Sequence, residues 1–490
     1  MIRPEIAAAV YATLAIVLAY LLKPKFDARN LVLRVFAVWT LSTPIIFVVG
    51  YNMLALAMIA VIVAVFAPMR AENRVILYIA TLAVIPNNYN ADVPFPGLNY
   101  LITLNYPIIS SLVLLGPIAV TALLRPKSSV SPLTDALVFL FFALVSIMSI
   151  RDLPFTSMLR MTFYELVSLV IPYIAISRTI VAKEAFEKVV WALLISGLIL
   201  STSGLISAFI HWNFYDFALP AGFPGIDIRG GALRVSATLA TALLGFVAAT
   251  GLISALYFRR DKRVDLIRLV LYAAIFPLVI YYTGSRGAIL ALFILGATYL
   301  VFTRMGGLVR RLYVVAGVIG AIAGFNYLRG GGAESIDAYG TFDYRIELLE
   351  TSIEQIRARP LFGTTAYLES GRFDHLIQGQ GIVDIVNGYL QIALEYGLVG
   401  LIIYLGMYFT VLKSLFDSSL RIRLRSADDE ERALGKVVAT CLALLVAYLA
   451  LISTVSFVSY IPDYGVMLLG VSAGMAHYAK RRTGRMAEHS

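Results

Sequence analysis

LIRLVLYAAIFPLVIYYTGSRGAILALFILGATYLVF, residues 266–302, is the stretch that decides the fold class. It contains two apolar runs, Leu266–Tyr282 and Ala288–Phe302, separated by the short segment Thr283-Gly284-Ser285-Arg286-Gly287. A helix needs roughly 17–25 apolar residues to cross a bilayer, and a charged side chain avoids the hydrocarbon layer. The pattern therefore predicts two spanning helices joined by a turn at the membrane boundary, with Arg286 at the start of the second helix.

The same apolar pattern recurs along the whole chain. Of its 490 residues, 60% are hydrophobic and only 14% are charged, and the mean hydropathy is +0.83. These values exclude a soluble globular protein. The apolar runs extend from Ile6–Leu22 to Tyr460–His477, include Leu308–Tyr327, and contain two short members, Leu54–Phe66 and Val75–Ile85. We predict an all-α, polytopic membrane bundle of about 12–15 spanning helices that forms a single transmembrane domain over residues 1–490.

The formal net charge of +10 has an explanation in the membrane. Cytoplasmic loops of polytopic proteins carry an excess of Lys and Arg, so the charge does not call for a nucleic-acid partner. The first apolar run lacks a small-residue cleavage site and is expected to remain as a helix. The single cysteine, Cys441, rules out an intrachain disulfide or a cysteine-based zinc site. Because nucleotide-binding and zinc-protease motifs are also missing from the sequence, we expect no metal and no cofactor.

Basic residues fall in alternate loops, which the positive-inside rule assigns to the cytoplasm. Two such clusters are Arg259–Arg268 and the predicted loop at residues 412–436, and every lysine of the chain lies in a loop of this kind. Alternation then places Arg234, Arg286 and Arg345 on the opposite, outer face. Arginine suits phosphate there because its planar guanidinium group can donate two parallel hydrogen bonds.

The longest outer segment is the predicted loop at residues 330–384. Its stretch 343–359 repeats apolar residues at helical spacing, namely Ile346, Leu349, Ile353 and Ile356. Thr341 or Asp343 can cap the start of this helix, and Pro360 ends it. We predict an amphipathic helix that lies on the outer membrane surface or covers a cavity.

The three outer arginines share a local pattern that favours anion binding. Arg234 and Arg286 each follow a glycine-containing turn and open a helical run, and Arg345 lies in the first turn of the amphipathic helix. A helix N-terminus has unpaired N–H groups and a partial positive charge, so an arginine in its first turn adds a second attraction for phosphate. Arg229 is a further candidate near Arg234. The alternative is that these side chains only extend toward lipid headgroups.

The order of these motifs resembles the bacterial O-antigen ligase/polymerase (Wzy-C) superfamily. The resemblance covers about residues 229–405 and rests on four segments: Arg234-Val235-Ser236, Ser285-Arg286-Gly287-Ala288, Arg345 followed by Pro360-Leu361-Phe362-Gly363, and Asn387-Gly388-Tyr389-Leu390-Gln391 followed by Glu395–Leu401.

This resemblance implies a GT-C-like membrane fold and glycan transfer from undecaprenyl pyrophosphate. It implies a multi-pass protein of the bacterial inner membrane whose active site faces the periplasm. Arg234, Arg286 and Arg345 would bind the pyrophosphate, and Arg229 and Asn387 would be further substrate-binding residues.

One position departs from the family pattern and leaves the general base open. Ligases of the superfamily carry a histidine immediately before the asparagine that matches Asn387, whereas this chain has Val386. The candidate catalytic bases that would deprotonate the acceptor hydroxyl are Asp384 and His375. Either residue is also compatible with an incidental role in a loop or cap. The missing histidine favours a polymerase over a ligase.

The leading prediction is metal-independent polymerisation of undecaprenyl-pyrophosphate-linked repeat units into O-antigen or exopolysaccharide at the periplasmic face. One alternative is an O-antigen ligase that transfers glycan to lipid A core or to protein. A second is a transporter of lipid-linked glycans. The expected partners are the lipid-linked glycan and the lipid bilayer, with a chain-length regulator or flippase as a further candidate and no nucleic acid.

Overall fold

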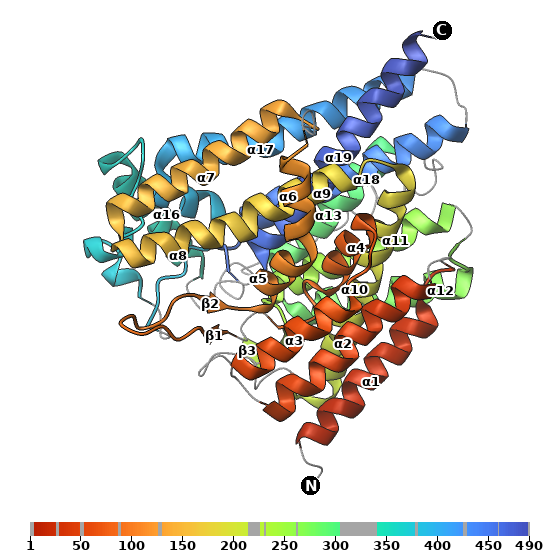
Figure 1. Cartoon of the computed structure of the whole chain (residues 1–490), viewed down its shortest axis with the longest axis horizontal. Helices are drawn as coiled ribbons and strands as arrows, with labels where there is room; N and C mark the ends of the chain where they lie inside the picture. Colours follow the sequence, from red (N-terminus) through yellow and green to blue (C-terminus); the bar gives the residue numbers. More distant parts are fainter. Residues whose placement is uncertain are drawn as a thin grey trace, which may run out of the picture.

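The computed structural model describes residues 4–25, 29–49, 53–86, 90–125, 130–213, 226–229, 232–260, 263–303, 341–377, 381–424, 429–458 and 460–488. These residues form a bundle of helices with two short antiparallel hairpins (Figure 1). Among them, eight helices are long and apolar enough to cross a membrane. The predicted all-α, multi-pass membrane fold is therefore confirmed. The predicted run Leu308–Tyr327 lies outside the described residues.

The helices follow the predicted apolar runs. In chain order they are α1 (Pro4–Leu22), α2 (Arg29–Val49), α3 (Met53–Phe66), α4 (Ala71–Thr81), α5 (Tyr106–Ser110), α6 (Gly116–Leu123), α7 (Pro132–Asp152), α8 (Phe155–Glu165), α9 (Ile171–Thr179), α10 (Lys183–Ile210), α11 (Thr241–Arg260), α12 (Leu266–Thr283), α13 (Arg286–Phe302), α16 (Thr341–Ala358), α17 (Gly388–Leu424), α18 (Asp429–Ile452) and α19 (Ile461–Glu488).

Short elements connect or extend these helices. The π-helical turns η1 (Ser111–Leu115) and η2 (Leu166–Val170) continue α5 into α6 and α8 into α9. One hairpin consists of β1 (Ala91–Asp92) and β2 (Thr103–Leu104). The other consists of β3 (Ile226–Arg229) and β4 (Ala232–Val235), in which Asp227 lies opposite Arg234.

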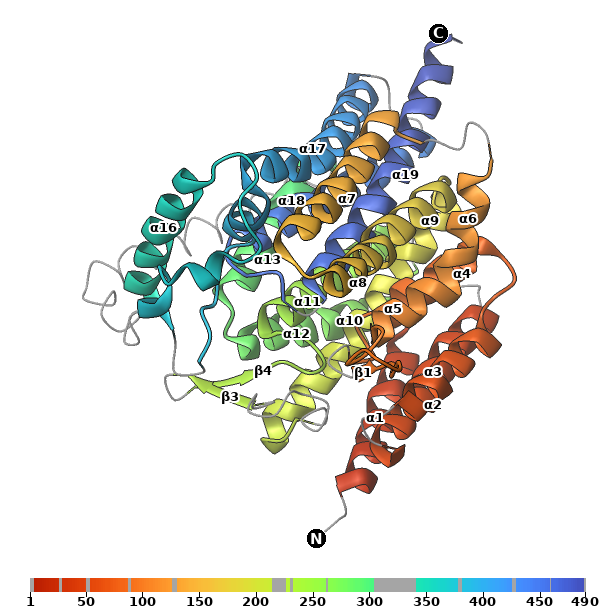
Figure 2. The same ribbon diagram turned by 60° about the vertical axis from the view of Figure 1, so that its left-hand side comes forward.

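The bundle has two chemically different ends. The α16 end carries α16, the two hairpins and the connection between α18 and α19, as Figures 1 and 2 show. The opposite, C-terminal end carries the chain terminus and the basic loops, with ion pairs from Arg263 to Glu187 at 2.7 Å and from Arg482 to Glu430 at 3.0 Å. The positive-inside rule predicts that this basic end faces the cytoplasm.

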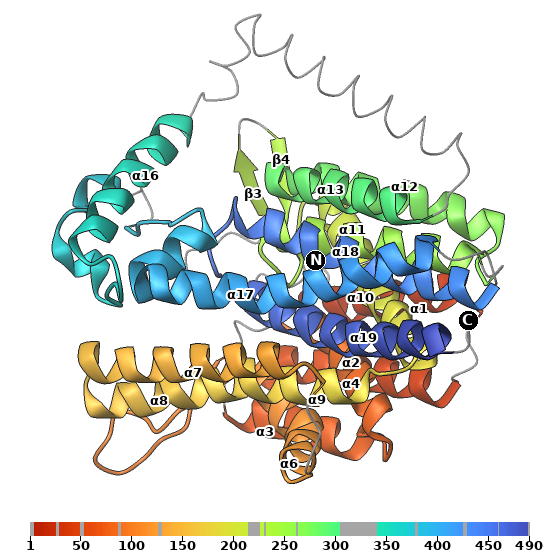
Figure 3. The ribbon, with the colours of Figure 1, turned by 90° about the horizontal axis from the view of Figure 1, so that it is seen from above.

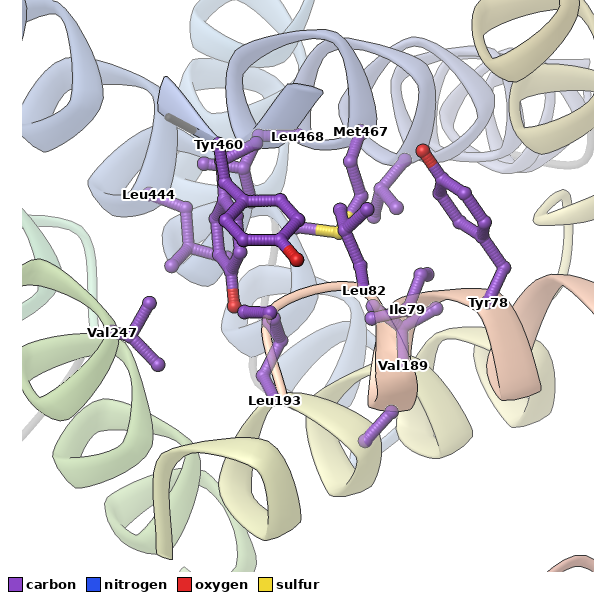
Figure 4. Close-up of a cluster of buried hydrophobic side chains, with 14 of the residues drawn as sticks. Tyr78, Ile79, Leu82, Val189, Leu193, Val247, Leu444, Tyr460, Met467 and Leu468 are labelled. Carbon is purple, nitrogen blue, oxygen red and sulfur yellow. The ribbon is translucent and has the colours of Figure 1, made fainter. Parts of the chain in front are cut away.

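The centre of the bundle is held together by close packing of apolar side chains. Figure 4 shows this buried cluster at the meeting of α4, α10, α11, α18 and α19, with Ile79, Leu82, Leu193, Val247, Leu444, Met467 and Leu468 among its members. Small residues bring α10 and α11 together, because a Cβ atom on Gly197 would lie only 3.3 Å from the Cα atom of Gly251. Such close backbone approach is how helices associate in a membrane, where apolar burial by itself gives little advantage.

The amphipathic helix predicted at 343–359 corresponds to α16, which packs against α17 (Figure 3). Its packed side differs from the one that the apolar pattern indicates. Leu348 and the small polar residues Thr351 and Ser352 are buried, whereas Ile346 and Leu349 are each 43% exposed. Within the described structure, this helix therefore turns an apolar face outward, as a helix lying on a membrane surface does.

The predicted cytoplasmic loop at residues 412–436 is largely helical. Helix α17 continues to Leu424, and α18 begins at Asp429, so only a short connection separates them. The residues from Lys413 onward include Leu415, Leu420 and Leu424 among polar neighbours. A helix with apolar residues on one side and polar residues on the other can extend beyond the membrane while its apolar side packs against the bundle. Charge alone was a poor guide to where the helix ends.

Candidate active site at the α16 end

The turn between α12 and α13 places Arg286 in the first turn of a helix. Gly284 ends α12 with a φ of +57°, a left-handed conformation that suits glycine. Ser285 is the N-cap of α13, and its hydroxyl accepts a hydrogen bond from the backbone N–H of Ala288 at 3.3 Å. Arg286 follows directly and is exposed, while Ser285 and Gly287 on either side are buried. The predicted arrangement of cap and arginine is present.

Arg234 reaches this same turn from the β3–β4 hairpin. The prediction that Arg234 opens a helical run was wrong, because residues 232–235 pair as β4 and α11 begins only at Thr241. Arg234 Nε donates a hydrogen bond to the carbonyl oxygen of Thr283 at 3.1 Å, and its Nη2 donates to the hydroxyl of Thr241 at 3.0 Å. The Arg234 side chain lies across Gly284, where an added Cβ atom would be 3.1 Å from its Cγ and Nε atoms. Two arginines far apart in the sequence therefore meet at one turn, and both sit beside the N-terminus of α13.

The connection between α18 and α19, residues 453–458, forms another wall of the site. Thr454 packs against the first turn of α13, since a Cβ atom on Gly287 would collide with its hydroxyl oxygen. Two residues later, the hydroxyl of Ser456 donates a hydrogen bond to Oδ1 of Asp384 at 2.8 Å. This connection links the arginine turn to the carboxylate, and the sequence reasoning missed it. Its run Ser453-Thr454-Val455-Ser456, polar and small between two spans, was the available signal.

Asp384 is also held from the side of α16. The hydroxyl of Tyr344 donates to the carbonyl oxygen of Asp384 at 3.0 Å and accepts from its backbone N–H at 3.2 Å. Arg345, the next residue, is exposed on α16. Arg345 therefore directly follows the tyrosine that holds the backbone of Asp384. Asp384 itself is half-buried.

A break interrupts α17, the helix that follows Asp384 in the chain. At Gly397 the backbone leaves helical geometry with φ +68° and ψ −171°. The Pro360-Leu361-Phe362-Gly363 segment fills the break: Leu398 N–H donates to Pro360 O at 2.8 Å, and Val399 N–H donates to Leu361 O at 3.2 Å. In return, Leu394 O accepts from Thr364 N–H at 2.8 Å. The loop after α16 therefore supplies the hydrogen bonds that the helix gives up.

The same loop is tied to the end of α7. Arg151 and Asp152 form an ion pair at 2.5 Å. Asp152 accepts hydrogen bonds from Thr365 N–H at 2.8 Å and from the Thr364 hydroxyl at 3.2 Å, and Arg151 donates to Gly363 O at 2.9 Å. Because these contacts join α7, the loop and α17, they make the α16 end a connected structure rather than a set of separate loops.

Part of this site lies in a segment that matches a known family. Residues 271–405 match the Wzy-C family model, described as O-antigen ligase. This match confirms the predicted resemblance. It covers Arg286, Arg345, the segment that fills the α17 break and Asp384, whereas Arg234 and the 453–458 connection lie outside it. No curated protein matches the chain.

Asn387, at the start of α17 in the Wzy-C segment, acts as a helix cap. Its Oδ1 accepts hydrogen bonds from the backbone N–H groups of Tyr389 at 2.9 Å and Leu390 at 3.3 Å. These are the N2 and N3 positions that an N-cap side chain normally satisfies. The predicted role of Asn387 in substrate binding therefore stays a prediction, while its structural role is plain.

Val386, the position that departs from the Wzy-C ligase pattern, belongs to a small apolar cluster. This cluster has Leu348, Tyr367, Phe373, Leu376, Ile385 and Leu394 at its centre, and Val386 packs against it. Burial raises the pKa of the Tyr367 phenol in this cluster, which keeps that ring neutral. Position 386 thus supports the loop instead of supplying a titratable group.

The two candidate bases of the Wzy-C segment differ in their surroundings. His375 lies near the surface on a short 3₁₀ turn, and its Nε2 is 3.4 Å from Oε1 of Glu347 on α16. Asp384 is instead bonded to Ser456 beside the arginine turn. For Arg229, only the backbone is described, at the end of β3 opposite Ala232. Among the described residues, no group of three or more His, Cys, Asp or Glu is arranged to hold a metal ion.

Proposed function

We propose that this protein polymerises lipid-linked oligosaccharide repeat units by metal-independent glycosyl transfer. The observation that carries the proposal is the meeting of Arg234 and Arg286 at the N-terminus of α13, inside a chain whose residues 271–405 match the O-antigen ligase family. Two guanidinium groups and a helix N-terminus together suit a pyrophosphate group. Members of this family act on lipid-linked glycans in the membrane, which supports a donor of this class, and we assign undecaprenyl pyrophosphate as its lipid carrier.

The arginines would act on the leaving group. As the acceptor oxygen attacks the anomeric carbon of the donor sugar, the bond from that carbon to the phosphate oxygen breaks. Negative charge then grows on the departing lipid pyrophosphate. Preorganised cations lower the energy of this charge most strongly in the transition state. Arg345, on the neighbouring α16, is assigned as a third contact to the same donor.

Asp384 would take the proton of the acceptor hydroxyl. The carboxylate is oriented by the hydrogen bond from Ser456 to Oδ1 and by the hydrogen bond from the Tyr344 hydroxyl to the backbone of Asp384. A positioned carboxylate of this kind commonly accelerates proton transfer by about 10²–10⁴-fold. We assign the base to Asp384 rather than His375, because Asp384 is bonded to Ser456 of the connection that also packs against the first turn of α13.

The two ends of the bundle support a periplasmic site. The basic loops lie at the C-terminal end, so the α16 end and its arginines would face the periplasm if the basic end faces the cytoplasm. Lipid-linked donors would be presented to the site there by a flippase, and a chain-length regulator is a further candidate partner.

The proposed reaction is tested with purified protein in lipid nanodiscs and a defined undecaprenyl-pyrophosphate-linked repeat unit. A ladder of lengthening glycans with release of undecaprenyl pyrophosphate is expected. Adding lipid A core as a competing acceptor separates polymerase from ligase. Transfer only to lipid A core would replace the proposal with ligation, and movement of intact substrate without a new glycosidic bond would replace it with transport.

Ligation remains the second candidate because the matching family model is described as O-antigen ligase. Val386 stands against it, since this side chain cannot accept a proton. A Val386→His variant that gained transfer to lipid A core would show that the missing histidine is what separates this site from a ligase site.

Replacing Asp384 with asparagine should lower polymer formation by about 10²–10³-fold, because the amide cannot accept the acceptor proton. Replacing Ser456 with alanine should cost roughly tenfold, since it removes one hydrogen bond to a charged group. The measurement is the initial rate of polymer formation by each variant with a defined lipid-linked repeat unit.

Ser453→Ala is the matched control for Ser456→Ala. Its hydroxyl donates to Ala450 O at 2.8 Å within α18, away from the carboxylate. A Ser456→Ala rate equal to that of Ser453→Ala would remove Ser456 from the proposed site.

A further inference from the structure

One face of α17 carries two polar side chains beside the connection at residues 453–458. Gln391 and Glu395 are one helical turn apart, and Gln391 Nε2 donates a hydrogen bond to Glu395 Oε1 at 3.1 Å. At the other end of its amide, Gln391 Oε1 accepts a hydrogen bond from the backbone N–H of Phe457 at 2.9 Å. Gln391 therefore bridges Glu395 and the backbone of the connection.

The two contacts of Gln391 require the same orientation of its amide. A backbone N–H group can only donate, so Phe457 needs the amide oxygen, while the Glu395 oxygen accepts from the NH2 group on the opposite side. Turning the amide over would place two donors against each other at Phe457. Gln391 and Glu395 are both half-buried, so water competes less with these hydrogen bonds.

The ring of Phe457 is held on the same helix. It packs over Gly388, where an added Cβ atom would be 3.0 Å from Phe457 Cζ, and it meets the Tyr404 ring with centroids 5.8 Å apart. Because both its ring and its N–H group contact α17, Phe457 fixes the place where the connection crosses this helix. The preceding residue, Ser456, then presents its hydroxyl to Asp384 at 2.8 Å.

The part of the connection that faces the arginine turn has a support of its own. The hydroxyl of Thr454 donates to Leu451 O at 2.9 Å at the end of α18, and Thr454 packs against Gly287 of α13. Loss of the Gln391 contacts should therefore release the part of the connection that faces Asp384 and leave the part that faces the arginine turn in place.

We propose that Gln391 and Glu395 are positioning residues for the glycosyl transfer, an inference that rests on the proposed function. Gln391 holds the backbone at Phe457, so that the Ser456 hydroxyl stays bonded to the carboxylate that takes the acceptor proton. Glu395 fixes the Gln391 amide in the orientation that this contact needs. Because the effect of both residues passes through Ser456, it should disappear in a protein that lacks the Ser456 hydroxyl.

The test is a double-mutant cycle with a defined lipid-linked repeat unit. Gln391→Leu removes both hydrogen bonds at a similar side-chain size. It should lower kcat by about tenfold, as Ser456→Ala does, and keep KM for the donor within about twofold of wild type. The protein that carries both substitutions should again lose about tenfold rather than about a hundredfold. A combined loss equal to the product of the single losses would overturn the proposal.

Glu395 is tested with a conservative and a disruptive variant. Glu395→Gln keeps an oxygen that can accept from Gln391 and should stay within about threefold of the wild-type kcat, whereas Glu395→Leu should lose about tenfold. Glu369→Leu is the control, because Glu369 is an exposed glutamate in the loop after α16, and its kcat should equal that of the wild type. A wild-type kcat in Glu395→Leu would remove Glu395 from the positioning role.

Amide hydrogen exchange tests the placement without polymer formation. Gln391→Leu should speed exchange in residues 453–458 by about tenfold and leave exchange within α18 as in the wild type. Unchanged exchange in the connection would overturn the proposal, and faster exchange throughout α17 and α18 would make Gln391 a residue of the fold instead. If the wild type forms no glycan product, the proposed function fails, and the exchange rates still decide whether Gln391 holds the connection.

Discussion

The Arg286→Ala variant should form polymer about 10²–10³-fold more slowly than the wild-type protein, since removal of one preorganised donor from a charge-stabilising site commonly has this effect. Arg286 stands at the N-terminus of α13, where the helix itself attracts negative charge. Arg286→Lys should be faster than Arg286→Ala but slower than the wild type. Lysine keeps the positive charge, but it lacks the planar guanidinium group that donates two parallel hydrogen bonds. Initial rates with a defined lipid-linked repeat unit measure both effects.

Arg234 should behave as the partner of Arg286. Arg234→Ala alone is expected to cost a similar factor, and the double variant should lose less than the product of the two single losses. Residues that act together on one group show this non-additivity. Part of the loss in Arg234→Ala will come from the turn itself, because Arg234 bonds to Thr283 and Thr241. The thermal stability of each variant shows how much of its loss of rate comes from a disturbed turn and how much from the missing phosphate contact.

Arg372→Ala is the matched control for these substitutions. Arg372 is an exposed arginine in the loop that follows α16, so its removal changes net charge at the same end of the bundle without touching the turn. Its rate should stay within about twofold of wild type. Wild-type rates in both Arg286→Ala and Arg234→Ala would reject a pyrophosphate site at this turn.

Gly397→Ala should prevent or strongly destabilise folding of the α16 end. Gly397 has φ +68°, which costs an alanine about 1–2 kcal/mol. In addition, a Cβ atom there would collide with the carbonyl group of Leu361 in the segment that fills the break. Since that segment replaces the hydrogen bonds of α17, we expect a total loss of more than about 3 kcal/mol. Thermal unfolding in detergent and resistance to limited proteolysis of residues 359–377 measure it.

Gly435→Ala in α18 is the control for the glycine prediction. Its added Cβ atom would meet Ile422 at an ordinary 3.5 Å, so alanine should be neutral or slightly stabilising in a helix. Gly363→Ala should resemble Gly397→Ala, because Gly363 also has a positive φ, +49°, and faces the backbone of Leu394. A Gly397→Ala protein as stable as wild type would show that the break in α17 does not depend on glycine.

The spans, the helix ends and the caps could be predicted, because each depends on residues that are close together in the sequence. Hydropathy over a short window indicates a span, and Gly284 followed by Ser285 indicates one helix end and the next cap. The amphipathic helix also follows from local spacing, although its buried side does not: Leu348 and Ser352 face the bundle, because the neighbouring α17 and the loop determine which side is covered. The positions of charged residues predicted helix ends less reliably, because α17 continues past Lys413 to Leu424.

The sequence alone therefore determined the membrane class, the spans, the caps and the place of Arg286 at a helix start, because each depends on residues within a few turns of one another. The prediction that Arg234 opens a helix was wrong, since Arg234 lies in β4. Only the tertiary structure decided that Arg234 lies across Gly284 and that Ser456 reaches Asp384. It also decided that Pro360-Leu361-Phe362-Gly363 fills the break at Gly397. These contacts join segments that are distant along the chain, and their partners are chosen by the packing of whole helices, which no local pattern encodes.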